Sequence, residues 1–147
     1  GMKHNFKVLV FAALLAVFAG CMTDDPVIAA GREWNPGSRL VADTTSEFDM
    51  TDQMLVQLRY GKGFDFNKLK VTFYEGTLGH RGVEIWSHEV MVSEKMDSYT
   101  LQGKAKNGKP ITAREMCKQK QAGPIVIEFS TEGRVIAQKQ IYLIRTR

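Results

Sequence analysis

The stretch PIVIEFSTEGRVIAQKQIYLI, residues 124–144, decides the fold that the sequence predicts. Within residues 124–129, Ile, Ile and Phe occupy every second position, which is the period of a half-buried β-strand. The segment STEG at residues 130–133 has the composition of a turn, and Gly133 can adopt the positive φ that a tight turn needs. Residues 134–144 then return as a second strand, so the stretch predicts an antiparallel β-hairpin.

The same alternation recurs upstream of the hairpin. MLVQLRY at residues 54–60 and KLKVTFY at residues 68–74 each place apolar side chains on one face and polar ones on the other. GVEIWSHEVMV at residues 82–92 changes phase along its length, which a bulge or kink near Ser87 would reconcile. Seven or eight short strands result once the segments at residues 38–43, 46–50 and 98–103 are added.

One short helix is expected among the strands, at about residues 113–119. Thr112 is its N-cap and Glu115 stands at the third helical position, the spacing of a capping box. So short a helix is not stable alone in water, and we expect it to cross between two packed sheets. The pattern predicts an all-β, antiparallel β-sandwich, immunoglobulin-like in outline, with a small closed barrel as the alternative. The Cys…Trp…Cys signature of antibody domains is absent, so the pattern indicates an architecture and no family.

The N-terminal residues have the pattern of an export signal. Lys3 and Lys7 are basic, and residues 8–19 form an apolar block without charge. This block is shorter than the roughly 20 residues that a membrane-spanning helix needs, and it fits the apolar region of a secretory signal peptide. A buried core helix is the alternative. We expect Gly1, which precedes Met2, to be a remnant of expression.

The end of the apolar block, FAGC at residues 18–21, resembles the lipobox of bacterial lipoproteins, in which Leu and two small residues precede Cys. Phe18 departs from the usual Leu. The resemblance implies that the peptide is cut before Cys21, that the Cys21 thiol takes a diacylglycerol, and that the new N-terminus is acylated. Several acyl chains make a stable membrane anchor. An Asp after the cysteine implies inner-membrane retention in that class, so Met22 favours the outer membrane.

We therefore expect a signal peptide at residues 1–20, a lipid-anchored tether at 21–37 and a β-sandwich domain at 38–147. Loss of the two lysines of the signal peptide lowers the net charge from +4 to +2. This small charge on an exported chain argues against a nucleic-acid partner. If Cys21 is acylated, Cys117 is the remaining cysteine, and no intramolecular disulfide can form.

Catalysis finds little support in the sequence. Cys117 could act as a nucleophile with His80 or His88 as its base, but no local motif supports this, and a structural thiol is the preferred interpretation. Paired carboxylates, a nucleophile elbow, a phosphate-binding loop and a dinucleotide-binding motif are all missing from the sequence. We therefore expect no enzymatic activity and no cofactor.

A metal site is a second alternative, around residues 80–89. Glu84 and His88 are expected on one strand face with Trp86, and His80 and Glu89 are close in sequence. Two aligned ligands are too few for a firm site, so we expect no bound metal.

Two features are candidates for binding. The basic segment, residues 103–120, carries six cations against Glu115, namely Lys104, Lys106, Lys109, Arg114, Lys118 and Lys120. It could attract an anionic envelope partner, such as lipid headgroups or an acidic glycan, or it could be an ordinary solvated surface. Trp34 is the better candidate for an exposed aromatic platform for sugars, because Trp86 is expected to fill the core.

These features predict a cell-envelope protein that is held to the membrane by an N-terminal lipid. Its leading function is a non-catalytic binding module for an envelope protein or glycan. The alternative is a structural or accessory subunit of an envelope assembly or secretion complex, in which strand edges pair with a neighbour.

Overall fold

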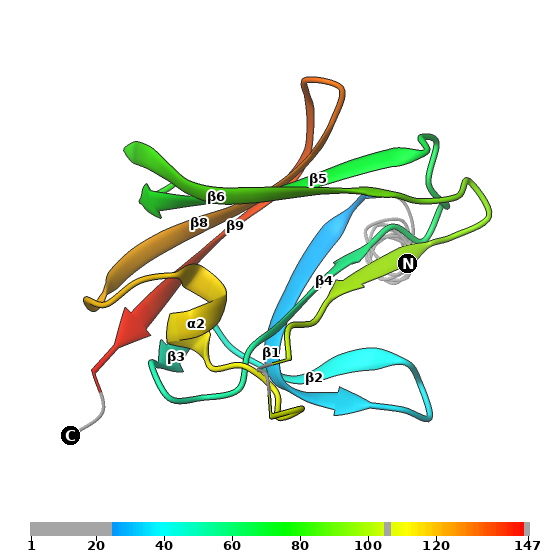
Figure 1. Cartoon of the computed structure of the whole chain (residues 1–147). Coiled ribbons are helices and arrows are strands. Elements are labelled where there is room, and N and C mark those ends of the chain that lie inside the picture. The colour runs from blue at the N-terminus through cyan, green and yellow to red at the C-terminus, as the bar shows by residue number, and fades with distance from the viewer. Residues whose placement is uncertain (1–24, 105–106, 146–147) are drawn as a thin grey trace, which may run out of the picture.

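The computed structural model describes residues 25–104 and 107–145, and in this part of the chain two β-sheets pack against each other (Figure 1). The first sheet has the order β2-β1-β4-β7, with β1 at Val27–Asn35, β2 at Leu40–Thr44, β4 at Leu55–Arg59 and β7 at Ser98–Leu101. The second has the order β3-β9-β8-β5-β6, with β3 at Glu47–Asp49, β5 at Lys68–Gly76, β6 at Arg81–Met91, β8 at Gly123–Thr131 and β9 at Arg134–Ile144. The predicted all-β sandwich is confirmed.

The order of the strands is immunoglobulin-like. β5, β8 and β9 lie side by side as the C, F and G strands do in that fold, and β1, β4 and β7 lie as the A, B and E strands do. Neighbouring strands are antiparallel except β3, which runs parallel to β9. The predicted turn joins β8 to β9 but is shorter than residues 130–133, because Ser130 and Thr131 belong to β8 and the turn consists of Glu132 and Gly133, with φ values of 47° and 85°.

Residues 27–37 are not a tether, which corrects the sequence prediction. β1 occupies most of this segment and is hydrogen-bonded between β2 and β4, so it is an interior strand. A Cβ atom at Gly31 would collide with the carbonyl oxygen of Ala42 on β2. The glycine therefore lets β2 approach closely, although its presence made the segment resemble a linker. The β-sandwich begins at Val27, eleven positions before the predicted boundary.

The core lies between the two sheets and consists of the side chains on their inner faces. The alternating positions that the sequence marked in residues 54–60, 68–74 and 124–129 supply nine of its 22 buried residues in the described part of the chain, and the rest come from other strands, loops and α2. The largest fully buried side chains include Phe48, Met54, Leu58, Leu69, Phe73, Ile127 and Phe129. Burial of each such side chain stabilises the folded state by about 1.5–3 kcal/mol. This burial holds the fold together, since the described residues form no disulfide.

The short helix α2, Ala113–Cys117, connects β7 of the first sheet to β8 of the second, as predicted. Its capping box is also confirmed. The Glu115 N–H donates to Thr112 Oγ1 at 3.2 Å, and the Thr112 N–H donates to Glu115 Oε1 at 3.0 Å. The helix ends two residues before the predicted position, because Lys118 adopts the left-handed conformation with a φ of 52°. Figure 1 shows α2 beside β3.

In the part of the chain that the structure describes, no helix has the length and apolar character of a membrane span. The predicted signal peptide, the lipobox and Cys21 lie outside the described residues. Lipid attachment at Cys21 therefore stays a prediction from the sequence.

Candidate functional site

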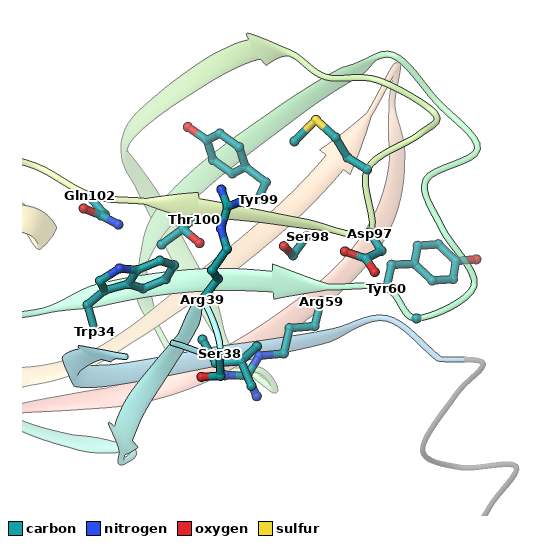
Figure 2. A pocket seen from close by; sticks show the side chains of 13 residues that line it. Trp34, Ser38, Arg39, Arg59, Tyr60, Asp97, Ser98, Tyr99, Thr100 and Gln102 are labelled. Atoms are coloured by element: carbon teal, nitrogen blue, oxygen red, sulfur yellow. The ribbon is translucent and has the colours of Figure 1, made fainter. Parts of the chain in front are cut away.

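A hollow of about 680 Å³ lies over the outer face of the first sheet, between the turn that joins β1 to β2 and strand β7 (Figure 2). We call it the groove. Its walls are formed by Trp34, Ser38, Arg39, Leu40, Arg59, Tyr60, Gly61, Met96, Asp97, Ser98, Tyr99, Thr100 and Gln102. The β1–β2 hairpin forms one wall, and its backbone at Arg39 and Val41 is hydrogen-bonded to side chains of β4.

Gln57 on β4 holds this hairpin in place. It points to the outer face of the sheet, yet it is fully buried, because the hairpin covers it. Its Nε2 donates to the carbonyl oxygen of Arg39 at 3.1 Å and to Thr100 Oγ1 at 2.9 Å. Its Oε1 accepts from the Val41 N–H at 3.2 Å and from Arg59 Nε at 2.8 Å. A single buried amide thus joins the hairpin, β4 and β7, which together make the groove.

Arg59 places a cation at the groove, and it forms no ion pair with any described residue. Besides its bond to Gln57, its Nη2 donates to the Val41 carbonyl oxygen at 2.8 Å. Within the described residues, Nη1 has no partner and no ion pair involves this side chain. Burial lowers the pKa of Arg59, because removal from water disfavours the charged form. The guanidinium nevertheless stays charged at neutral pH. The groove therefore contains a half-buried positive charge that is not part of an ion pair among the described residues.

Arg39 adds a second cation from the β1–β2 turn. It has a φ of 58°, in the left-handed region that Gly and Asn occupy more readily than other residues. The turn is shaped by Asn35, whose Oδ1 accepts from the Gly37 N–H at 3.0 Å and from the Ser38 N–H at 3.3 Å. The Arg39 N–H donates to the Asn35 carbonyl oxygen at 2.8 Å. In Figure 2 the exposed Arg39 side chain extends over the groove.

Trp34, which sequence analysis selected as an exposed aromatic, lines the groove and is half-buried there. It lies near the end of β1, opposite Val41 on β2. Figure 2 shows its ring on the same side of β7 as Thr100 and Gln102. An aromatic ring, two guanidinium groups and several hydroxyl and amide groups are thus brought to one concave surface.

The basic segment does not share that surface. Five of its cations, Lys104, Lys109, Arg114, Lys118 and Lys120, are exposed and none lines the groove, whereas Lys106 lies outside the described residues. The segment leaves β7 after Leu101, at the end of the first sheet opposite to that where β1 begins. The Ala113 N–H donates to the carbonyl oxygen of Asp52 at 2.7 Å, which ties the segment to the loop between β3 and β4. The segment has the exposure expected of a solvated surface.

Cys117 is fully buried at the end of α2. Burial raises the pKa of its thiol to about 12, and its Sγ lies 3.9 Å from Met54 Sδ. A thiol with this pKa is protonated at neutral pH, and a protonated thiol is a poor nucleophile. His80 and His88 are both exposed on the β5–β6 hairpin. The geometry is therefore that of a structural thiol.

A bulge in β6 separates the residues that were expected to share a strand face. Trp86 pairs with Phe73 and Glu84 with Tyr74, so Ile85 is the extra residue, two positions before the predicted Ser87. Glu84 therefore faces away from Trp86 and His88, which corrects the prediction that all three share a face. Among the described residues, no three His, Cys, Asp or Glu side chains form a group that could hold a metal ion.

Trp86 packs against the core, as the sequence analysis expected. Its ring stacks on Phe73 with centroids 5.0 Å apart, and its Nε1 donates to the Met116 carbonyl oxygen at 2.8 Å. The Lys118 ammonium lies 5.0 Å from the centre of the Trp86 ring. Trp86 thus joins β6 to α2 and has a structural role. It lies on the second sheet, whereas Trp34 lies on the first.

Sequence reasoning missed a buried carboxylate on the outer face of the second sheet. Glu128 accepts from Arg81 Nη1 at 2.9 Å, from Gln138 Nε2 at 2.8 Å and from the Tyr74 hydroxyl at 3.3 Å. Burial raises the pKa of Tyr74, and the charge of Glu128 raises it further. All of these groups have partners, so the cluster has the character of a structural ion pair. Nothing in the sequence distinguishes Glu128 from a solvent-facing strand residue.

Neither a protein-family model nor a curated protein sequence matches this chain. The functional inference therefore comes from the chemistry of the groove. Sequence analysis found only Trp34 among its important side chains. Gln57, Arg59 and Arg39 were missed, because polar residues on an outward strand face or in a turn normally contact water.

Proposed function

We propose that this protein is a lipid-anchored, non-catalytic binding module of the cell envelope, and that its ligand, an envelope glycan or protein, occupies the groove. The observation that supports this most strongly is the groove itself. Its volume of about 680 Å³ lies within the range of about 300–1,000 Å³ that small-ligand sites have. A hairpin held by a fully buried amide forms one wall, so the site exists before any ligand binds.

The side chains of the groove favour a glycan over a protein. A sugar ring presents a face of C–H groups that can lie on the ring of Trp34, and a rim of hydroxyl groups. Ser98, Thr100 and Gln102 stand at alternate positions at and beyond β7, so their polar groups lie on one side, toward the groove. A stable protein interface buries about 800 Å² on each partner, which calls for a broad surface rather than a hollow.

Binding without cleavage is supported by the carboxylates of the groove. Glycoside hydrolysis uses a pair of carboxyl groups about 5–9.5 Å apart. Asp97 is the one carboxylate that lines the groove in the described part of the chain. Arg, Ser, Thr and Gln side chains can bind a saccharide by hydrogen bonds without supplying a proton donor and a nucleophile.

Membrane attachment through Cys21 is supported by the FAGC sequence and by where the domain begins. β1 starts at Val27, six residues after Cys21, and six residues span at most about 20 Å. Val27 pairs with Arg59, so β1 starts at the Arg59 end of the groove. A lipid on Cys21 would hold this end of the groove near the bilayer. Met22 favours the outer membrane.

Affinity capture from solubilised cell envelopes tests this function. The full chain, Trp34→Ala and Tyr142→Ala serve as baits, because Tyr142 is an exposed aromatic on the second sheet and makes a matched control. We expect the wild type and Tyr142→Ala to enrich the same glycan or protein, and Trp34→Ala to lose it while keeping its β-sheet circular dichroism. Equal capture by Trp34→Ala, or no enrichment above an unrelated β domain, would contradict the proposal.

The accessory-subunit alternative is supported by a different observation, the long edge strand β6. Its outer edge is unpaired in the described structure, and Val83 and Met91 on it are 66% and 71% exposed. An exposed strand edge can accept a strand from a neighbouring subunit. This function predicts a complex that survives high salt and is lost in Val83→Lys, whereas Val135→Lys on β9 should retain it. Loss of the complex in high salt would count against strand pairing.

A further inference from the structure

We infer that the ligand of the groove is a saccharide that carries a carboxylate, with the carboxylate held between Arg39 and Arg59 and a sugar ring lying on Trp34. This inference rests on the proposed binding function and adds the chemical class of the ligand to it. Three observations carry it, one from each of the two arginines and one from the charge of the groove as a whole.

Arg59 is the first observation. Its guanidinium is half-buried, and within the described residues it donates only to the uncharged oxygens of Gln57 and Val41. A buried charge is stable when a group of opposite charge accompanies it, and the described structure provides none within ion-pair distance. Because Nη1 has no protein partner, it can donate to a carboxylate that enters the groove.

Arg39 is the second observation. Its left-handed backbone is one that Gly would adopt without strain, so the local fold does not need an arginine there. The side chain is exposed, extends over the groove and makes no ion pair within the described residues. A planar guanidinium binds a carboxylate through two parallel hydrogen bonds. Carboxylate binding would therefore explain why an arginine stands at a backbone position that favours glycine.

The third observation is the charge of the groove. Arg39 and Arg59 bring two positive charges and Asp97 one negative charge, which leaves an excess of +1. A single carboxylate matches that excess, whereas a phosphate dianion would overcompensate it. Trp34 and the polar side chains of β7 suit a sugar ring next to the carboxylate better than they suit an acidic peptide. A uronic or sialic type of residue combines these two parts in one ligand.

The matched variants are Arg39→Gly and Lys118→Gly. Each removes one positive charge and places glycine at a left-handed position, with φ values of 58° and 52°, so neither strains the backbone. Arg39 lines the groove, whereas Lys118 belongs to the basic segment and lies over Trp86. The pair therefore separates the groove from the basic segment as the place where an anion binds.

The experiment measures binding of the full chain to an array of oligogalacturonic acids, glucuronic acid oligomers and sialylated oligosaccharides, each with its neutral methyl ester, together with sulfated galactans and polyglutamate. We expect the wild type to bind at least one carboxylated saccharide about tenfold more tightly than its ester, because a charged hydrogen-bonded pair is lost in the ester. Arg39→Gly should lose that preference, and Lys118→Gly should keep it.

Four results would overturn the inference. Equal binding of acids and esters would leave a glycan-binding groove without carboxylate recognition, so the proposed function would survive alone. Equal or tighter binding of sulfated galactan or polyglutamate would reject the ligand class. Loss of the preference in Lys118→Gly would assign anion binding to the basic segment. Absence of binding to every saccharide would reject a saccharide ligand, while Trp34-dependent capture of an envelope protein would still support the binding module.

Discussion

Replacing Gln57 by leucine tests whether one buried amide holds the β1–β2 hairpin over the first sheet. Gln57 has no exposed surface and makes four hydrogen bonds, to the backbone of Arg39 and Val41 and to the side chains of Arg59 and Thr100. Leucine has a similar volume, so the change leaves no large cavity, but it can replace none of these bonds.

The expected loss of stability follows from these contacts. A protein hydrogen bond contributes about 1 kcal/mol net, so the four bonds contribute about 4 kcal/mol. Burial of the apolar leucine side chain returns about 1–2 kcal/mol. We therefore expect Gln57→Leu to lower the free energy of unfolding by about 2–3 kcal/mol. For a domain of this size, that corresponds to a fall in Tm of roughly 6–12 °C.

Urea unfolding followed by circular dichroism measures this loss. Gln102→Leu is the matched control, because Gln102 lines the same groove but is exposed. Its free energy of unfolding should stay within about 0.5 kcal/mol of the wild-type value. A loss below 1 kcal/mol for Gln57→Leu, or equal losses for the two variants, would refute the idea that Gln57 holds the hairpin.

Three further predictions concern other parts of the fold. Thr112→Ala should lower the free energy of unfolding, measured in urea, by about 1 kcal/mol. Because hydrogen bonds from Thr112 lower the pKa of Glu115, this difference from wild type should shrink as the pH falls through the titration of the Glu115 carboxyl. A difference that does not change with pH would contradict the capping box. Burial raises the pKa of the Cys117 thiol to about 12, so the thiol loses its proton at a lower pH in the unfolded chain than in the folded one. The free energy of unfolding should therefore fall between about pH 9 and pH 12, by up to about 1.4 kcal/mol per pH unit. Cys117→Ala should lack this contribution to the pH dependence, and an unchanged pH dependence in that variant would argue against burial of the thiol. Arg81→Met leaves Glu128 buried without its cation and should lower the free energy of unfolding by about 2 kcal/mol, which is more than Glu128→Gln should. Equal losses for the two variants in thermal unfolding would show that the ion pair is unimportant.

Much of the fold could be predicted from local patterns. Residues 124–144 alternate clearly because each strand there has one face in the core and one face toward solvent. β1 was missed for the opposite reason. Ile28, Ala29 and Ala30 are all buried, since the hairpin covers the outer face of the first sheet while the core covers the inner face. Burial on both faces removes the alternation, and Gly31 then makes the segment resemble a linker.

The site was harder to predict than the fold. Gln57 and Arg59 occupy the polar positions of an alternating strand, and the sequence therefore assigned them to solvent. Only the return of the chain at β2, which depends on tertiary packing, turns those positions into the floor of a groove. The basic segment is the reverse case. Its composition is conspicuous in the sequence, yet its described side chains are spread over an exposed loop and helix without lining the groove.

The most direct test of the central claim is a ¹⁹F NMR titration of the full chain labelled with 5-fluorotryptophan, which gives one signal for each of the two tryptophans. The titrant is the carboxylated saccharide that binds best on the array, and Trp34→Phe assigns the signals. We predict that the Trp34 signal shifts with saccharide concentration while the Trp86 signal, stacked on Phe73 in the other sheet, does not move. A Trp34 signal that is unchanged at saturating saccharide would show that the ligand binds elsewhere and that the groove is not the site.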